Sequence, residues 1–137
     1  MPSFRETIEI AATGDATWQV LGDLASVRDW IPGVVVVELT EDGRVCTFAD
    51  GRVQREVISD YSAEEHSFRY SIDSGLPVRD NRGSFAVEAR GDGALVVWES
   101  SFEPLDPSAE EELSQMWQNA LPLVLGNLKR LVEESAR

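Results

Sequence analysis

The sequence predicts an α+β fold in which a seven-stranded antiparallel sheet is covered by one long C-terminal helix. Residues 3–10 alternate between apolar and polar side chains, as a half-buried strand does. Between Val34 and Phe102, six strand-like segments follow one another with only short turns between them. After Ser108 the apolar residues recur at helical spacing. A chain of 137 residues is the size of one domain, so we expect a single domain over residues 1–137.

One or two short helices are expected directly after the first strand. Thr13 is suited to cap a helix N-terminus, and Trp18, Leu21 and Ala25 then recur at helical spacing. The dipeptide Pro32-Gly33 ends this helical pattern.

The six central strands are separated by turns with recognisable residues. Asp50-Gly51 and Asp92-Gly93 are the strongest hairpin signals, because glycine supplies the positive φ that tight turns need. Short turns favour pairing of sequential strands, so the pattern predicts an antiparallel meander.

The C-terminal helix is predicted to begin near Ser108, which with Glu111 fits a capping box. Pro122 lies inside it, and we expect a kink there, eased by Gly126. One apolar stripe has the spacing of a buried face: Leu113, Trp117, Ala120, Leu121, Val124, Leu128 and Leu131. That stripe is expected to cover the apolar face of the sheet.

Composition excludes several classes of function. The chain has 25 acidic and 12 basic residues and a formal net charge of -13, so its field repels nucleic acid and anionic lipid headgroups. One cysteine and one histidine provide no zinc cluster, and no nucleotide-binding motif is present, so no cofactor or metal is expected. Without a signal peptide or an apolar run of about 18 residues, the chain is expected to be cytoplasmic and not an integral membrane protein.

Several segments in order resemble one known family. The segments are LASVRDWIPGV, DGRVQREVISD, FRYSI and NRGSFAVEARGDGALVVWESSFEP, with the junction Trp30–Gly33 and the block Asn81–Pro104 as the best anchors. Together they resemble the polyketide cyclase/dehydrase branch of the START-like (SRPBCC) superfamily over essentially the whole chain. The resemblance implies the helix-grip fold, in which a curved sheet wraps the C-terminal helix and encloses a cavity for an apolar or aromatic molecule.

Strand alternation and the helical stripe together identify candidate ligand-binding residues. On the last three strands the inward faces carry aromatic residues and one serine, and the helix contributes its apolar stripe. The expected lining is Phe48, Phe68, Tyr70, Phe85, Trp98, Ser100, Trp117, Leu121 and Val124.

The strand that holds Glu56 cannot be oriented from its own pattern, because both faces carry one long charged side chain beside apolar residues. The family's enzymatic members have an inward glutamate after a D-G turn and an inward arginine on the preceding strand. Glu56 matches that glutamate, which implies that it points inward. The position of the arginine is Cys46 here, so the resemblance leaves Glu56 without its cation unless Arg44, of the same parity as Cys46, replaces it.

Three hypotheses for function follow. The first is binding of a small hydrophobic or aromatic, lipid- or polyketide-like molecule between the sheet and the helix. The second is a polyketide cyclase or dehydratase in which Glu56 is the general acid/base and Tyr70 or Arg44 polarises a carbonyl. The third is a module that binds a protein partner, including a second copy of the chain as a homodimer.

Overall fold

The computed structural model describes residues 1–136, in which seven strands, three α-helices and two short 3-10 helices follow one another. In chain order they are β1 (Ser3–Ile10), α1 (Gly14–Leu21), η1 (Leu24–Ser26), α2 (Val27–Trp30), β2 (Val34–Leu39), β3 (Gly43–Phe48), β4 (Val53–Ser62), β5 (Ser67–Ser74), β6 (Val78–Arg90), β7 (Gly93–Pro104), η2 (Pro107–Ala109) and α3 (Glu110–Ser135).

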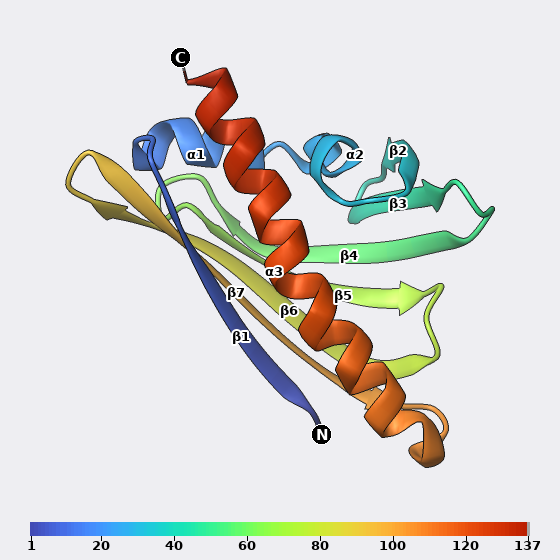
Figure 1. Cartoon of the computed structure of the whole chain (residues 1–137). Coiled ribbons are helices and arrows are strands. Elements are labelled where there is room, and N and C mark those ends of the chain that lie inside the picture. Colours follow the sequence, from blue (N-terminus) through green and yellow to red (C-terminus); the bar gives the residue numbers. More distant parts are fainter. Residues whose placement is uncertain (137) are drawn as a thin grey trace.

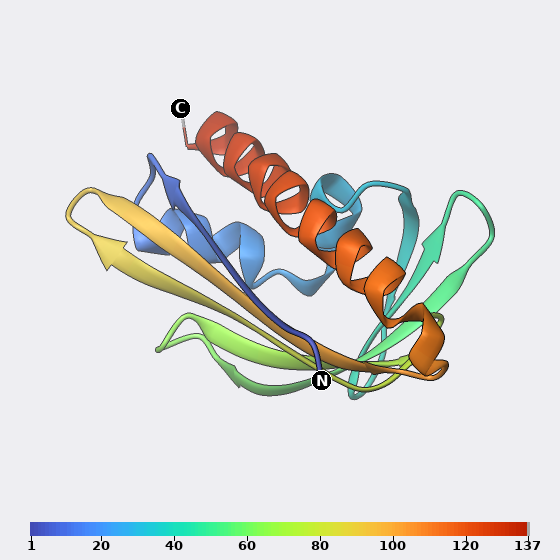
Figure 2. The ribbon, with the colours of Figure 1, turned by 60° about the horizontal axis from the view of Figure 1, so that its bottom comes forward.

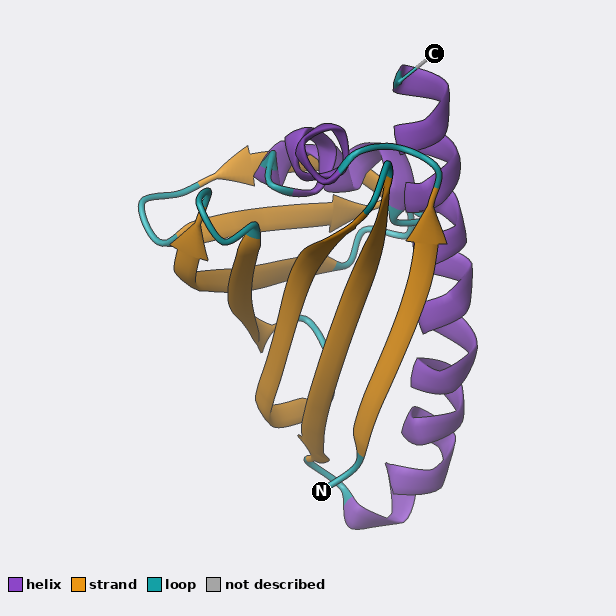
Figure 3. Ribbon diagram, turned by 90° about the vertical axis from the view of Figure 1, so that its left-hand side faces the viewer, coloured by secondary structure: helices purple, strands orange, loops and turns teal. Residues whose placement is uncertain are grey.

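All seven strands form one antiparallel sheet with the order β1-β7-β6-β5-β4-β3-β2. From β2 to β7 each strand pairs with its neighbour in the sequence, and β1 pairs with β7, where Ile10 faces Ala94. Figure 3 shows the sheet as one curved layer. The predicted six-stranded meander and the seven-stranded antiparallel sheet are therefore both confirmed.

The long helix α3 lies across one face of the sheet, and α1 and α2 lie on that same side (Figures 1 and 2). It packs chiefly against β1, and also against α2, α1 and β7. Its buried side chains follow the helical repeat: Leu113, Trp117, Leu121, Val124, Leu125, Leu128 and Val132. This is the helix-grip arrangement that the family resemblance implied. Within residues 1–136, no helix is long and apolar enough to cross a membrane.

The helical stretch after β1 is divided into three short pieces. Thr13 caps α1 as predicted, because its hydroxyl accepts a hydrogen bond from the backbone N–H of Ala16 (3.1 Å). The chain turns at Gly22, against which the Trp18 indole packs so closely that any side chain there would overlap the ring. Short helices stabilised by tertiary packing therefore replace one continuous helix.

Two local predictions were wrong in detail. In the β6–β7 hairpin the residue with positive φ is Gly91 (φ 63°), whereas Gly93 already belongs to β7 and pairs with Arg90. The predicted capping box of Ser108 does not form: Asp106 caps η2, which precedes α3, and α3 itself has no side-chain cap at Ala109. The Asp106 carboxylate accepts hydrogen bonds from the backbone N–H (3.0 Å) and hydroxyl (2.8 Å) of Ser108, which lies within η2. The sequence pattern identified the hairpin and the start of the helical segment, but not which residue adopts positive φ or which one caps the helix.

Gly126 lies inside α3, which continues without a break past Pro122, and a methyl group at Gly126 would meet no atom within 4 Å. We expect Gly126→Ala to raise the free energy of unfolding by about 0.5–1 kcal/mol, because glycine loses more backbone entropy in a helix than alanine. Urea unfolding measures the change. A lower stability would show that the helix needs glycine's freedom one turn after Pro122.

Gly43→Ala is the matched control, because a Cβ at Gly43 would overlap the backbone carbonyl oxygen of Glu56 on the adjacent strand. The same substitution should therefore destabilise the protein at this position.

Candidate functional site

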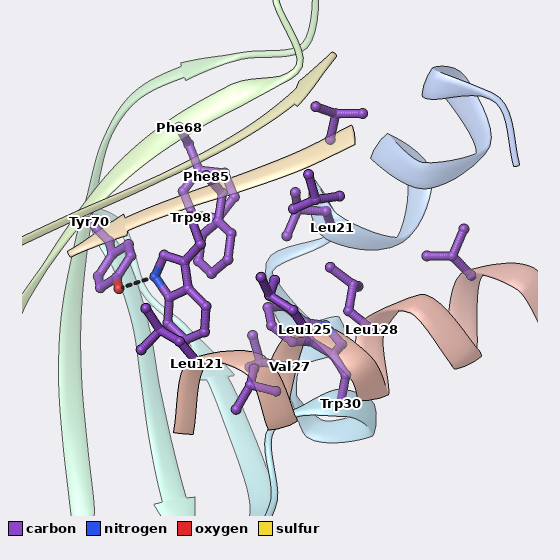
Figure 4. Close-up of a cluster of buried hydrophobic side chains, with 14 of the residues drawn as sticks. Leu21, Val27, Trp30, Phe68, Tyr70, Phe85, Trp98, Leu121, Leu125 and Leu128 are labelled. Carbon is purple, nitrogen blue, oxygen red and sulfur yellow. Dashed lines mark hydrogen bonds between the residues drawn. The ribbon is translucent and has the colours of Figure 1, made fainter. Parts of the chain in front are cut away.

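Four aromatic side chains from three adjacent strands cover the inner face of the sheet (Figure 4). Phe68 and Tyr70 come from β5, Phe85 from β6 and Trp98 from β7, and all four are buried. The ring of Phe85 lies at the centre of the group, with centroids 5.5 Å from Phe68, 5.8 Å from Tyr70 and 4.8 Å from Trp98. These residues have the inward direction that strand alternation predicted.

Tyr70 has a polar role within this apolar group. Its hydroxyl accepts a hydrogen bond from the Trp98 indole N–H (2.8 Å), which Figure 4 marks as a dashed line. The ring fits because position 83 on the neighbouring strand is glycine, where any Cβ would overlap the ring. Burial raises the pKa of the Tyr70 hydroxyl to about 12. Tyr70 therefore keeps its proton at neutral pH and can act as a hydrogen-bond donor.

Helix α3 supplies the opposite wall with Trp117, Leu121 and Val124, all buried as the sequence predicted. The Trp117 indole N–H donates a hydrogen bond to the Ser100 hydroxyl on β7 (2.9 Å). The side chain of Trp117 also packs on Phe102, with ring centroids 4.4 Å apart. The first half of α3 is thus attached to the sheet by one indole.

Glu56 and Arg44 form a buried ion pair. They are directly opposite each other on β4 and β3, and the Glu56 Oε1 atom lies 3.0 Å from both Nε and Nη2 of Arg44. Only 2% of the Arg44 side chain and 5% of the Glu56 side chain is exposed. Arg44 also donates a hydrogen bond through Nη1 to the Leu24 carbonyl of η1 (2.9 Å). The structure therefore orients Glu56 inward and places a guanidinium beside it.

Gln54 and Arg52 extend this pair toward the start of β4, and sequence reasoning missed both. The Gln54 amide nitrogen donates to the other carboxylate oxygen of Glu56, Oε2 (2.8 Å), and its amide oxygen accepts from Arg52 Nη1 (2.7 Å). The signal was the alternation of residues 52, 54 and 56, which places polar side chains on one side of β4 and of the residue just before it. We call Arg44, Arg52, Gln54 and Glu56 the polar cluster.

Cys46, at the position where the family resemblance implied an arginine, is a buried neighbour of this cluster. It pairs with Gln54 in the sheet. Burial and, to a smaller extent, the Glu56 charge raise the pKa of its thiol to about 11. The thiol is therefore protonated at neutral pH, and Cys46 packs as a small apolar residue.

Phe48 lies away from the aromatic group, at the far end of β3. It is only half-buried, and the Arg52 guanidinium carbon lies 3.8 Å above the centre of its ring. This distance is that of a cation–π contact. Phe48 and Arg52 together mark the boundary between the interior and the solvent at this end of the sheet.

Within residues 1–136, every buried side-chain nitrogen or oxygen has a hydrogen-bond partner. The interior polar groups thus satisfy one another. A groove of about 560 Å³ lies on the opposite, outer face of the sheet, and serine and charged side chains such as Arg82 and Glu99 dominate its lining. The candidate ligand-binding residues other than Tyr70 and Ser100 do not line this groove.

The family model described as polyketide cyclase / dehydrase and lipid transport matches residues 1–133. No curated protein matches. Among solved structures, the protein XoxI from Bacillus cereus is 26% identical, with a TM-score of 0.86 and 96% of each chain covered.

Two further structures share the fold at lower identity. A START superfamily protein from Mycobacterium smegmatis is 16% identical, with a TM-score of 0.80, and the alignment covers 96% of this chain and 97% of that one. The di-domain ARO/CYC BexL from the BE-7585A biosynthetic pathway is 18% identical, also with a TM-score of 0.80. The alignment covers 97% of this chain but 47% of BexL.

Arg44→Met should lower the free energy of unfolding by about 3–5 kcal/mol, because it leaves the Glu56 carboxylate buried without its cation. Urea unfolding at neutral pH measures the loss. The double variant Arg44→Met/Glu56→Leu should recover most of it, because no buried charge then remains.

Arg55→Met is the matched control, because Arg55 precedes Glu56 on β4 and forms an ion pair that is exposed. Arg55 pairs with Asp42 at 3.2 Å, but 43% and 52% of these side chains is exposed, so the expected loss is about 0–1 kcal/mol. Equal losses for Arg44→Met and Arg55→Met would contradict the importance of the buried pair.

Proposed function

Since the chain belongs to the polyketide cyclase/dehydrase and lipid transport family, we propose that it binds a small hydrophobic or aromatic molecule between the sheet and α3. The observation that carries the proposal is the polar cluster, whose Arg44 and Glu56 are buried charged side chains in a largely apolar interior. A buried ion pair contributes little to net stability compared with apolar residues of the same volume. A buried glutamate held by two hydrogen-bonding partners is instead suited to orient the polar part of a ligand.

The placement of α3 supports this location. The helix packs on the β1 and β7 side of the sheet, while the polar cluster lies on β3 and β4 near the other edge. A ligand between these regions would contact the aromatic side chains of β5 to β7 and reach the polar cluster with one end. Binding requires outward movement of α3 or of the β3–β4 hairpin, because the interior side chains are packed against one another here.

The binding proposal is tested with a neutral fluorescent probe, N-phenylnaphthylamine, which becomes brighter in an apolar site. Val124 is a buried residue on the inner side of α3, so Val124→Phe should fill ligand space and weaken probe binding about 10-fold or more, the loss expected for about 1.4 kcal/mol. Native mass spectrometry of the purified protein should also show a retained small molecule.

Leu123→Phe is the matched control, because the neighbouring Leu123 is 59% exposed and the substitution should leave affinity unchanged. Unchanged binding in a folded Val124→Phe variant would place the probe elsewhere, for example in the groove on the outer face, and would contradict the proposal.

A cyclase or dehydratase is the second candidate function, and the Arg44–Glu56 pair is the observation that favours it. Glu56 would transfer the proton, and the Tyr70 hydroxyl, which is protonated at neutral pH, would polarise a carbonyl.

Glu56→Gln keeps the shape of the side chain and removes its ability to exchange a proton. We expect it to reduce turnover of a polyketide-like substrate by about 100-fold or more while ligand binding is largely retained. Unchanged turnover would exclude Glu56 as the acid or base. Glu38→Gln is the matched control, because it makes the same change at an exposed glutamate on the edge strand β2, and turnover should be unchanged. Gln54→Glu would not serve, because it adds a charge to the cluster.

A further inference from the structure

Arg52 differs from the other arginines that are buried or half-buried. Within residues 1–136 these are Arg44, Arg52 and Arg55, and the first and last are paired with Glu56 and Asp42. The guanidinium of Arg52 has no carboxylate within 4 Å among these residues. Its partners are the Gln54 amide oxygen (2.7 Å), the Gly75 carbonyl (3.3 Å) and the Phe48 ring. All three are uncharged, so the charge of Arg52 is solvated only by dipoles and water.

The polar cluster therefore carries a net positive charge. It contains two guanidinium groups and one carboxylate, linked through Gln54. The chain as a whole has a formal net charge of -13, so its long-range field repels anions. An anion can be recognised here only through direct contact with the cluster, and Arg52 is the member with charge left to neutralise.

The hydrogen-bonding geometry of Arg52 points to the same conclusion. Only Nη1 makes hydrogen bonds within residues 1–136, so none of these residues uses the donors on Nε and Nη2. Two adjacent donors of one guanidinium match the two oxygens of a carboxylate. The side chain also lies at the boundary of the interior, between the start of β4 and the β5–β6 turn at Gly75.

We propose that Arg52 binds the carboxylate of an amphipathic ligand whose apolar part extends from Phe48 into the interior. This assignment rests on the proposed function, because it names the class of molecule that the same interior holds. The Gln54 amide hydrogen-bonds to both Arg52 and Glu56, so it connects the carboxylate-binding group to the buried ion pair. The ligand class is thus a carboxylic acid with an apolar or aromatic body.

The test compares decanoate with decanol, each displacing N-phenylnaphthylamine at neutral pH. Wild type should bind decanoate about 10-fold or more tightly than decanol, the difference expected for a charge-assisted hydrogen bond. Arg52→Gln should weaken decanoate binding about 10-fold and so remove this preference, with a smaller change for decanol, whose hydroxyl carries no charge. Arg55→Gln, which alters the nearby exposed pair with Asp42, should keep the preference.

The outcomes are distinct. Two results would overturn the role of Arg52 and leave the proposed function standing. One is equal affinity of wild type for decanoate and decanol, and the other is a preference for decanoate that Arg52→Gln retains. Failure of wild type to bind decanol, decanoate and the probe overturns both. If circular dichroism shows that Arg52→Gln is unfolded, Arg52→Lys replaces it. Lysine keeps the positive charge but lacks the two adjacent N–H donors of a guanidinium, so Arg52→Lys should show a reduced preference for decanoate. A full preference for decanoate in Arg52→Lys also contradicts the proposal.

Discussion

The structure depends on the burial of one face of the sheet beneath α3. A single sheet with one apolar face is stable only when another element covers that face. The helix is fixed at both ends for this purpose. Near its start Trp117 donates to Ser100, and near its end Lys129 donates to the Glu9 carbonyl (2.8 Å) while Glu133 accepts from the backbone N–H of Ala11 (2.8 Å). The space between these attachments is where the candidate site forms.

Burial beneath the helix imposes a second constraint, because each polar group enclosed with the apolar side chains needs a partner. The structure meets it with two separate sets of contacts. Trp98 and Trp117 donate to Tyr70 and Ser100, so the centre of the interior is neutral and internally satisfied. The polar cluster on β3 and β4 is charged, and it reaches the solvent boundary at Arg52. The interior therefore has a neutral middle and one charged end.

Sequence patterns predicted the fold well because strand order follows from short turns, and the direction of most side chains follows from alternation. Phe85 and Trp98 needed no more than that. The orientation of β4 could not be predicted in the same way, since Arg55 and Glu56 make its two faces similar. The family resemblance oriented Glu56, but its partner Arg44 could be assigned only from the register of β3 and β4. Gln54 was missed because an amide becomes informative only when its two neighbours are known.

The division of the interior also determines where selectivity can arise. In the neutral middle, a ligand group that displaces Tyr70 or Ser100 must itself accept the indole hydrogen bond, or a buried donor is left without a partner. An apolar body that leaves those pairs intact incurs no such cost, so under the proposed function this region would distinguish ligands by shape and size alone. At the charged end the situation is reversed, since Arg52 has donors that no described residue uses. In the proposed binding mode a polar group gains most from contact there, so the apolar body of the ligand would lie beneath α3 and its polar end beside Phe48 and Arg52.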